Sequence, residues 1–329
     1  MTIERLAVIG GGAWGTALAQ VVAAGGRETL LWAREAEVVE AINARHENSV
    51  FLPGQQLDSA IRATGNLAEA AAADAWLVVT PAQHMRAVLK DAPDCSKPLI
   101  LCSKGIDETS GLLLHDVAKS ACPGAQVAVL SGPTFAHEVA AGLPTAVTLA
   151  ATDTALAEAL RTRIARPNFR IYLSDDVIGA EIGGAVKNVL AIACGVVEGK
   201  CLGQNARAAL IARGFAEMTR FGLDCGARRE TLAGLSGLGD LVLTCSSVSS
   251  RNFSLGKGIG EGRPAAELMA DRRTVAEGAF TAPVLARLAA ERGIDMPIVA
   301  VVDSLLAGRC SADQALEQLL ARPPRTESL

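Results

Sequence analysis

The first thirty-two residues contain the feature that most constrains the fold. A short apolar run, Leu6–Ile9, is followed without a linker by Gly10-x-Gly12-x-x-Gly15 and then by an Ala-, Leu- and Val-rich stretch of helical length. A second apolar run, Leu30–Trp32, comes at the distance expected of the next parallel strand. This order of strand, glycine turn, helix and strand predicts a unit that binds a dinucleotide.

Each glycine of the turn has a separate physical role. Gly10 permits the tight turn, Gly12 lets a pyrophosphate approach bare backbone, and Gly15 lets the helix pack closely on the strand. The N–H groups and the positive dipole end of the helix would face the same phosphates. We therefore expect Gly10, Gly12 and Gly15 to bind a dinucleotide cofactor.

Composition excludes several other classes of protein. The formal net charge is −4 and no basic stripe is present, so nucleic acid is not expected as a partner. Uninterrupted apolar runs fall short of the roughly 18 residues of a membrane span, so no membrane insertion is expected. Met1–Arg5 lead directly into the first strand, which leaves no room for a signal peptide.

The cysteines and histidines show no metal-binding pattern. The eight cysteines are scattered without a CxxC, and the four histidines also lack metal spacing. We therefore expect reduced thiols in the core, no metal, and a cytoplasmic protein.

The pattern of elements changes near Ser174–Asp176. Before that turn, apolar β-rich runs alternate with stretches of helical length, which predicts an α/β domain with a doubly wound parallel sheet at residues 1–177. After it, helical patterns follow one another from Glu181–Val197 to Ser311–Leu320, which predicts an all-helical domain at residues 178–329.

Arg34 lies nineteen residues after Gly15, just beyond the second strand. A site selective for NAD usually has an acidic residue here for the ribose 2′-hydroxyl, whereas an arginine suits the 2′-phosphate of NADP. The alternative is a solvated arginine with Glu35 as the ribose ligand. The sequence favours NADPH over NADH as the cofactor.

Lys187 lies in an otherwise apolar stretch of small residues. An ammonium group is costly to bury unless it is paired or used in chemistry. In a helix its side chain leans over the turn that contains Gly183 and Gly184, and each of these glycines weakens the helix by about 1 kcal/mol. Two interpretations follow: the glycines leave space for a ligand beside the lysine, or they only permit close helix packing.

Other polar residues follow predicted strands or glycine-rich turns. Lys104 and the segment Ser131–Phe135 each come directly after a strand, at the sheet edge where open α/β folds bind ligands. Asp240 ends a turn with three spaced glycines and could orient a lysine or a hydroxyl. Ser250–Asn252 precede a helix start and suit a phosphate dianion; the alternative is a helix cap with a solvent-exposed arginine.

Taken in order, these motifs resemble those of the bacterial-type NAD(P)-dependent glycerol-3-phosphate dehydrogenases. The match covers nearly the whole chain and includes the glycine turn together with Asn48–Gly54, Ser103–Gly105, Ser131–Ala136, Gly184–Asn188, Gly237–Leu241, Ser250–Asn252 and Val275–Gly278. The resemblance implies interconversion of sn-glycerol 3-phosphate and dihydroxyacetone phosphate, which supplies glycerophospholipid synthesis.

The resemblance also implies a role for individual residues. Lys187 would be the general acid/base at the C2 oxygen, Lys104 would touch cofactor and substrate, and Asp240 would orient the lysine and the substrate oxygens. The residues implied to hold the triose phosphate are Gly132, Thr134, Ser250, Arg251 and Asn252, and those implied to line the cofactor are Trp14, Arg34, Ala136, Arg251, Val275 and Glu277.

Two other functions stay open on the residues alone. A 3-hydroxyacid dehydrogenase of related architecture would need a carboxylate site near the lysine, whereas Ser250–Asn252 fits phosphate better. A non-enzymatic NAD(P)-binding redox sensor would not need Lys187, Lys104 and Asp240 together. The expected partner is a small triose phosphate, and the helical domain could form a homodimer.

Overall fold

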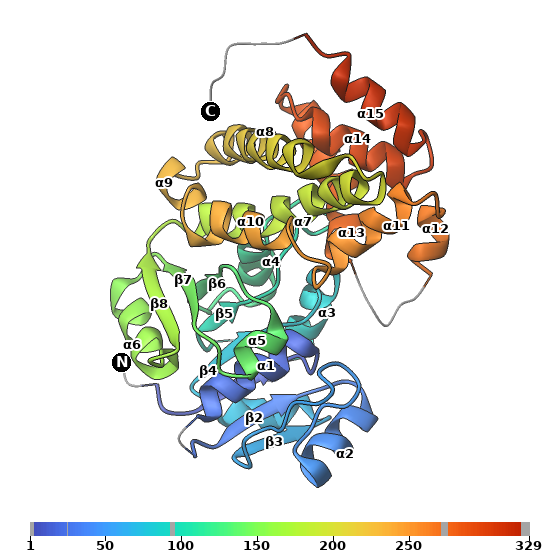
Figure 1. Cartoon of the computed structure of the whole chain (residues 1–329). Helices are drawn as coiled ribbons and strands as arrows, with labels where there is room; N and C mark the ends of the chain where they lie inside the picture. The colour runs from blue at the N-terminus through green and yellow to red at the C-terminus, as the bar shows by residue number, and fades with distance from the viewer. Residues whose placement is uncertain (1–2, 25, 93–95, 271–275, 324–329) are drawn as a thin grey trace. The chain divides into compact units, whose positions relative to one another are not determined.

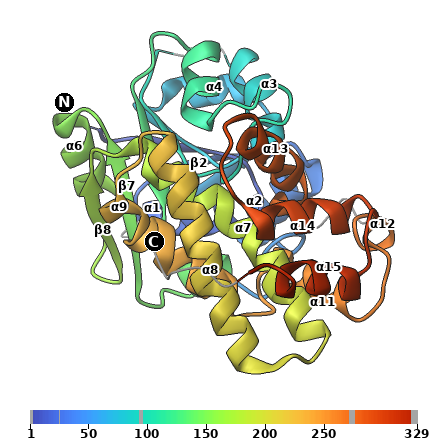
Figure 2. The same cartoon turned by 90° about the horizontal axis from the view of Figure 1, so that it is seen from above.

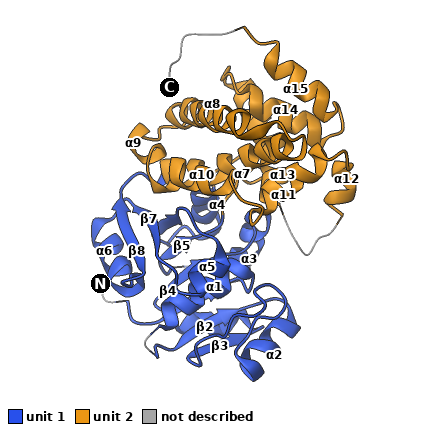
Figure 3. Ribbon diagram, in the orientation of Figure 1, with its two compact units in different colours: residues 1–103, 114–177 blue, residues 104–113, 178–329 orange. Residues whose placement is uncertain are grey.

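The computed structural model describes residues 3–24, 26–92, 96–270 and 276–323. The chain forms two compact units, shown in separate colours in Figure 3. Unit 1 contains Met1–Ser103 and Leu114–Val177, and unit 2 contains Lys104–Leu113 and Ile178–Leu329. The short segment Lys104–Leu113 therefore belongs to the helical unit although it lies within the first half of the sequence.

Unit 1 is built on one eight-stranded sheet (Figure 1). The order across the sheet is β3-β2-β1-β4-β5-β6-β7-β8, and every neighbouring pair is parallel except β6 and β7. The strands are β1 Leu6–Ile9, β2 Thr29–Trp32, β3 Ile61–Thr64, β4 Ala75–Val78, β5 Leu99–Leu101, β6 Val127–Ser131, β7 Thr145–Ala151 and β8 Phe169–Ser174.

Both faces of the central strands are buried. All four residues of β1 and all four of β4 are inaccessible to solvent, as expected where helices cover both sides of a parallel sheet. Helix α1 packs against α5, and α3 packs against α4. The helices of unit 1 are α1 Ala13–Ala23, α2 Ala36–Arg45, α3 Met85–Lys90, α4 Leu114–Ala121, α5 Ala136–Ala140 and α6 Thr154–Ile164, with 3₁₀ turns η1 Leu67–Ala72 and η2 Ala82–His84.

Two features of the sheet differ from the sequence prediction. The predicted parallel sheet contains one antiparallel pair, β6 and β7, because the chain after β6 passes through α5 and returns with Ser131 opposite Thr148. The strand β3 was not predicted, since Ile61-Arg-Ala-Thr64 is short and exposes Arg62 at the sheet edge. The α/β class itself is confirmed.

Unit 2 is helical and is organised around α7, Val177–Gly199. This helix is long and apolar enough to cross a membrane, but almost all of its apolar stretch is buried inside the protein, as in the core helix of a globular domain. Figure 2 shows α13, α14 and α15 lying side by side in chain order. The other helices are α8 Gly203–Asp224, α9 Arg229–Leu232, α10 Asp240–Thr244, α11 Arg251–Gly260, α12 Ala265–Leu268, α13 Glu277–Glu291, α14 Pro297–Leu306 and α15 Ala312–Leu320, with a π-helical turn η3 at Leu235–Gly239.

Glycines let α7 and α11 approach at backbone distance. A Cβ atom added to Gly195 would lie 2.1 Å from the Phe253 carbonyl oxygen, and one added to Gly256 would lie 1.9 Å from that of Ile192. Larger residues at these positions would push α11 away from α7. The close crossing holds the start of α11 near the middle of α7.

The expectation of reduced core thiols is only partly met. Cys122, which directly follows α4, is disulfide-bonded, so the prediction is wrong for this residue. Cys201 is a free cysteine and is exposed, whereas Cys194 and Cys245 are free and buried.

A buried carboxylate joins α8 to the start of α14. Glu217 is 1% exposed, and its two side-chain oxygens accept the backbone N–H groups of Ile298 at 2.8 Å and Val299 at 3.2 Å. Burial raises the pKa of Glu217 to about 7, against the lowering effect of these two hydrogen bonds. Arg220 lowers this pKa slightly and Asp295 raises it.

We expect Glu217 to make the protein less stable as pH rises. Between about pH 4.5 and 7 the folded protein keeps the proton and the unfolded chain does not, so unfolding releases a proton and the free energy of unfolding falls with pH. Glu217→Gln cannot ionise. The free energy of unfolding of the variant, relative to the parent, should therefore rise by about 1–3 kcal/mol from pH 5 to pH 7.5 in urea titrations. A difference that does not change with pH would contradict this.

Candidate functional site

The predicted glycine turn in unit 1 has the geometry of a phosphate cradle. Gly10 has φ of 131°, and a Cβ atom there would lie 2.8 Å from the Val79 carbonyl oxygen. A Cβ atom on Gly15 would lie 1.8 Å from the Gly10 carbonyl oxygen, so both positions require glycine. Gly12 begins α1 with no side-chain cap, and the space beside it is open. The first N–H groups of α1 are therefore accessible to an anion.

Asn48 supports this turn from behind. The side chain is fully buried, and its Nδ2 donates to the Gly11 carbonyl and to Thr16 Oγ1, each at 2.8 Å. Its Oδ1 accepts the N–H of Phe51 at 3.1 Å. The sequence analysis noted Asn48 only as part of a matching segment and gave it no role. The structure shows that it fixes the shape of the glycine turn.

The remaining predicted cofactor residues of unit 1 lie near the same sheet edge. Trp14 lies in the first turn of α1, and its buried Nε1 has no hydrogen-bond partner within the described residues. Arg34 directly follows Ala33 at the end of β2 and is exposed. Ala136 begins α5 and packs on the core of unit 1. An uncapped helix start with open space beside Gly12 fits a dinucleotide phosphate.

Two predicted substrate residues follow β6. Gly132 has φ of 156°, and a Cβ atom there would lie 3.0 Å from the Val147 Cα. Thr134 is half-buried, and its Oγ1 donates to the Gly132 carbonyl at 3.2 Å. The hydroxyl therefore contributes to the shape of this loop in the absence of ligand.

Unit 2 brings two lysines to one carboxylate. Asp240 Oδ1 accepts from Lys187 Nζ at 2.7 Å, and Oδ2 accepts from Lys104 Nζ at 2.6 Å. The Asp240 side chain is 1% exposed, that of Lys187 is 8% exposed and that of Lys104 is 15% exposed. The cluster therefore carries one more positive than negative charge in a largely water-free environment.

Thr244 completes the cluster, and the sequence analysis missed it. Lys187 Nζ donates to Thr244 Oγ1 at 2.9 Å, and this hydroxyl in turn donates to Asp240 Oδ1 at 3.2 Å. Asp240 and Thr244 lie one turn apart on α10, the spacing that brings side chains together on a helix face. That spacing after the glycine turn was the available signal. Within the described residues, the third N–H of Lys187 has no acceptor, so it is available to a substrate oxygen.

Glycines place Asp240 against Lys187. A Cβ atom on Gly183 of α7 would lie 2.4 Å from the Ser236 carbonyl oxygen, and one on Gly237 would lie 1.9 Å from that of Leu232. The π-helical turn η3, closed by a bond from Gly239 N–H to the Gly234 carbonyl at 3.0 Å, thus packs directly on α7. Gly183 therefore permits close packing of η3 on α7 and does not leave space for a ligand.

Lys104 begins a short loop anchored in the core of unit 2. Ile106 is buried in that core and pairs with Leu113 in an isolated antiparallel bridge. Asp107 Oδ2 accepts the N–H of Ser110 at 3.0 Å. These contacts make Lys104 part of a held loop and not a free surface lysine.

The charge environment poises Lys187 for proton transfer. Burial and, to a smaller extent, the charge of Lys104 lower its pKa to about 8, against the raising effect of Asp240. A lysine with a pKa near 8 exchanges a proton readily at physiological pH. The arrangement can therefore donate a proton to an oxygen that gains negative charge and take it back in the reverse reaction.

The predicted phosphate segment lies at the start of α11. Ser250 caps this helix by accepting the Phe253 N–H at 3.2 Å, so its oxygen is engaged. Arg251 is exposed. The helix-cap alternative therefore describes Ser250, while Arg251 is exposed to solvent.

Asn252 is buried and ties three helices of unit 2 together. Its Nδ2 donates to Asn188 Oδ1 at 2.9 Å, and its Oδ1 accepts the Gly278 N–H at 2.9 Å. Asn252 thus connects the residue next to Lys187 with the start of α13, whose first residue is Glu277. Val275, also expected to line the cofactor, lies outside the described residues.

The glycine turn of unit 1 and the buried lysine–carboxylate cluster of unit 2 define the class of dinucleotide-dependent dehydrogenases. The model of the NAD-dependent glycerol-3-phosphate dehydrogenase N-terminus matches residues 5–157, and that of the C-terminus matches residues 176–317. The chain belongs to the NAD-dependent glycerol-3-phosphate dehydrogenase family.

Individual relatives are similar over almost their whole length. A glycerol-3-phosphate dehydrogenase [NAD(P)+] of Erythrobacter litoralis is 66% identical, with 99% of this chain and 98% of the relative covered. One from Novosphingobium aromaticivorans is 63% identical over 100% of this chain and 99% of the relative. A crystal structure of glycerol-3-phosphate dehydrogenase from Coxiella burnetii has a TM-score of 0.93 at 38% identity, covering 97% of this chain and 99% of that one.

Proposed function

We propose that this chain is an NAD(P)-dependent sn-glycerol-3-phosphate dehydrogenase that uses Lys187 as its general acid/base. The observation that carries this proposal is the Lys187–Asp240–Lys104 cluster, in which a buried lysine of lowered pKa has one N–H available for a substrate oxygen. The names of the relatives agree with this activity.

In ketone reduction, Lys187 donates its available proton to the C2 oxygen of dihydroxyacetone phosphate as that oxygen gains negative charge. Asp240 and Thr244 hold the ammonium group in place through the 2.7 Å and 2.9 Å bonds. Lys104 adds a second positive charge near the developing alkoxide, which stabilises the transition state. In the oxidation direction, neutral Lys187 accepts the hydroxyl proton.

The nicotinamide cofactor, when bound, supplies or accepts the hydride. The residues that would hold it are Gly10, Gly12, Gly15 and Trp14 at the start of α1, with Arg34 at the end of β2. The other residues proposed to line it are Ala136, Lys104, Arg251, Val275 and Glu277. The substrate phosphate would be held by Gly132, Thr134, Ser250, Arg251 and Asn252.

Arg34 should select NADPH. Its exposed guanidinium follows β2 and can pair with a 2′-phosphate. Arg34→Asp replaces this attraction with repulsion, so the ratio of kcat/KM for NADPH to that for NADH should fall at least about tenfold. Steady-state kinetics with both cofactors measures this ratio. An unchanged ratio would make Arg34 an ordinary surface residue.

A substrate comparison tests the proposed activity. Oxidation of NADPH and NADH is followed with dihydroxyacetone phosphate, with a 3-oxo acid, and with no substrate added. We expect turnover with the triose phosphate alone. Turnover only with the 3-oxo acid would indicate a 3-hydroxyacid dehydrogenase, and none with either would leave a cofactor-binding sensor; the comparisons with known proteins favour neither alternative.

The wider setting of the enzyme follows from this activity. We propose that residues 1–177 form the dinucleotide-binding domain and residues 178–329 the substrate domain. We also propose a cytoplasmic location, use of the product in glycerophospholipid synthesis, and a homodimeric state whose surface would lie on the helical domain.

A further inference from the structure

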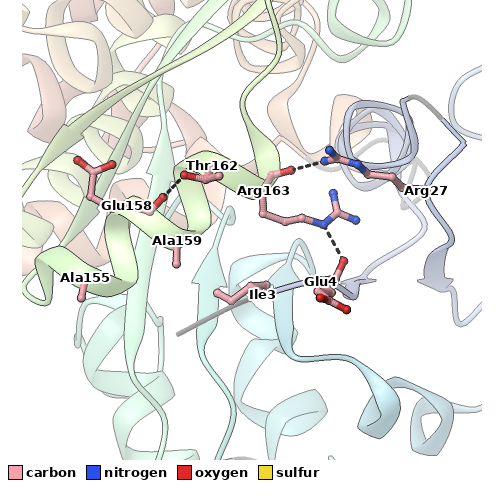
Figure 4. Close-up of a pocket in the computed structure, with 8 residues that line it drawn as sticks. All are labelled: Ile3, Glu4, Arg27, Ala155, Glu158, Ala159, Thr162 and Arg163. Carbon is pink, nitrogen blue, oxygen red and sulfur yellow. Dashed lines mark hydrogen bonds between the residues drawn. The ribbon is translucent and has the colours of Figure 1, made fainter.

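A pocket of about 700 Å³ lies in unit 1 beside α6 and the residues that precede β1 (Figure 4). It lies at the amino end of β1, whereas the glycine turn follows the carboxyl end, so about 13 Å of strand separates the two. The pocket is therefore distinct from the proposed dinucleotide site. Its lining residues are Ile3, Glu4, Arg27, Ala155, Glu158, Ala159, Thr162 and Arg163.

Arg27 and Arg163 line this pocket, and Arg166 shares a hydrogen-bond acceptor with Arg163. Arg163 is only 7% exposed, and it donates through Nε to the Glu4 carbonyl at 2.7 Å and through Nη1 to the Val22 carbonyl at 3.3 Å. Arg166 donates to the same Val22 carbonyl at 3.2 Å, and Arg27 donates to the Arg163 carbonyl at 3.2 Å. Within the described part of the chain, every acceptor of these three side chains is a main-chain carbonyl.

The positive charges exceed the negative charge that faces them. Val22 and Arg163 lie in the last turns of α1 and α6, and each helix C-terminus is equivalent to about half a negative charge. Glu158 is engaged by Arg161 at 2.5 Å, and Glu4 is exposed and contributes its backbone carbonyl. About one negative charge from the two helix ends and one from the carboxylate of Glu4, which lines the pocket, therefore face three cations.

The excess of positive charge affects the pKa of Arg163. Burial and then the charges of Arg27 and Arg166 lower its pKa to about 10. Within the described residues, Arg163 Nη2 makes no hydrogen bond. The atom is not fully buried, so its N–H groups are accessible from the pocket. Arg27 is exposed at the same pocket.

We propose that this pocket binds a tetrahedral oxyanion: phosphate, or the phosphate group of a small monoester. Arg163 Nη2 and Arg27 would contact the anion, and Arg166 would add charge behind them. Guanidinium groups match phosphate oxygens in geometry and charge. Ile3, Ala155 and Ala159 form an apolar wall that suits the organic part of a monoester. The proposal does not depend on the dehydrogenase activity.

Thermal unfolding of the whole protein tests the site with inorganic phosphate. The parent, Arg27→Gln and Arg170→Gln are titrated with phosphate against chloride at equal ionic strength. Arg170 is an exposed arginine of β8 in the same unit that does not line the pocket, so it is the matched control. Phosphate that binds elsewhere, including at the proposed substrate site, shifts the unfolding temperature of all three proteins equally.

We expect the apparent phosphate affinity of Arg27→Gln to be about tenfold weaker than that of the parent and of Arg170→Gln. Equal affinity in all three proteins would overturn the proposal and leave the arginines as caps of α1 and α6 only. Phenyl phosphate, titrated in the same way, separates the two sources. If phenyl phosphate binds more tightly than inorganic phosphate and its binding depends on Arg27, the ligand is a monoester. If the two ligands bind equally tightly and both depend on Arg27, the ligand is the free anion.

A second measurement needs no variant. Crystals of the parent soaked in selenate should show anomalous density for selenium about 4 Å from Arg163 Nη2, because a selenate oxygen at hydrogen-bond distance lies between the two atoms. Selenate bound at other sites with none in this pocket would contradict the proposal.

Discussion

Lys187→Met should reduce kcat about 10²- to 10⁴-fold while leaving the fold and cofactor binding intact. The variant loses the proton donor that is held by Asp240 and Thr244, and it loses a positive charge near the developing alkoxide. Asp240 still accepts from Lys104 at 2.6 Å, so its buried carboxylate keeps a partner. Methionine fills the space of the lysine stem without a buried charge.

The matched control is Lys257→Met. Lys257 is a half-buried lysine of α11 that pairs with Glu261 on the same helix. We expect this variant to keep the parental kcat, and both variants to keep the parental Tm and NADPH affinity. A Lys187→Met protein of normal stability with more than half the parental kcat would remove Lys187 from the mechanism.

Arg251→Ala should weaken catalysis with dihydroxyacetone phosphate about 10- to 100-fold in kcat/KM. Arg251 exposes its guanidinium at the start of α11, next to the helix N–H groups that also favour a dianion. Binding of the remote phosphate should position the carbonyl, so kcat should fall as well as KM rise. Ser250 remains as the helix cap, so the fold should be unaffected.

A cycle of two enzymes and two substrates isolates this contact. Unphosphorylated dihydroxyacetone should be a very poor substrate of the parent and should be almost unaffected by Arg251→Ala. Arg263→Ala, in an exposed pair with Glu267, is the matched control and should behave as the parent. Equal losses with both substrates would mean that Arg251 serves the cofactor or the fold, and Lys104 would become the next candidate for the phosphate.

Much of the fold could be predicted from local pattern. The runs at β1, β2 and β4–β8 are strongly apolar, and the long helices of unit 2 have clear periodicity. The direction of β7 could not be predicted, because it depends on where α5 packs and not on the residues of β7. The short edge strand β3 carries an exposed arginine and lacks a clear alternation. The sequence also did not predict that Lys104–Leu113 belongs to unit 2, because this depends on contacts of Ile106 with residues far away in the chain.

The site was predictable where residue type is unusual for its surroundings. A lysine within an apolar helix and a carboxylate after spaced glycines both indicated chemistry. Thr244 and Asn48 are not unusual in this way, because threonine and asparagine are common in any polar stretch. The available signal for Thr244 was its helical spacing from Asp240, and the role of Asn48 arises only from tertiary contacts. The role of Gly183 was ambiguous, since the residue that packs against it, Ser236, is far away in the sequence.

The pH dependence of kcat/KM in both directions tests the central claim that Lys187 moves the proton. Its pKa is lowered to about 8, and it must be charged to reduce the ketone and neutral to oxidise the alcohol. We predict that kcat/KM for dihydroxyacetone phosphate falls about tenfold per pH unit above pH 8, while that for sn-glycerol 3-phosphate rises about tenfold per pH unit until pH 8 and then levels off. Two profiles that are flat through pH 8, or that change in the same direction, would contradict the account.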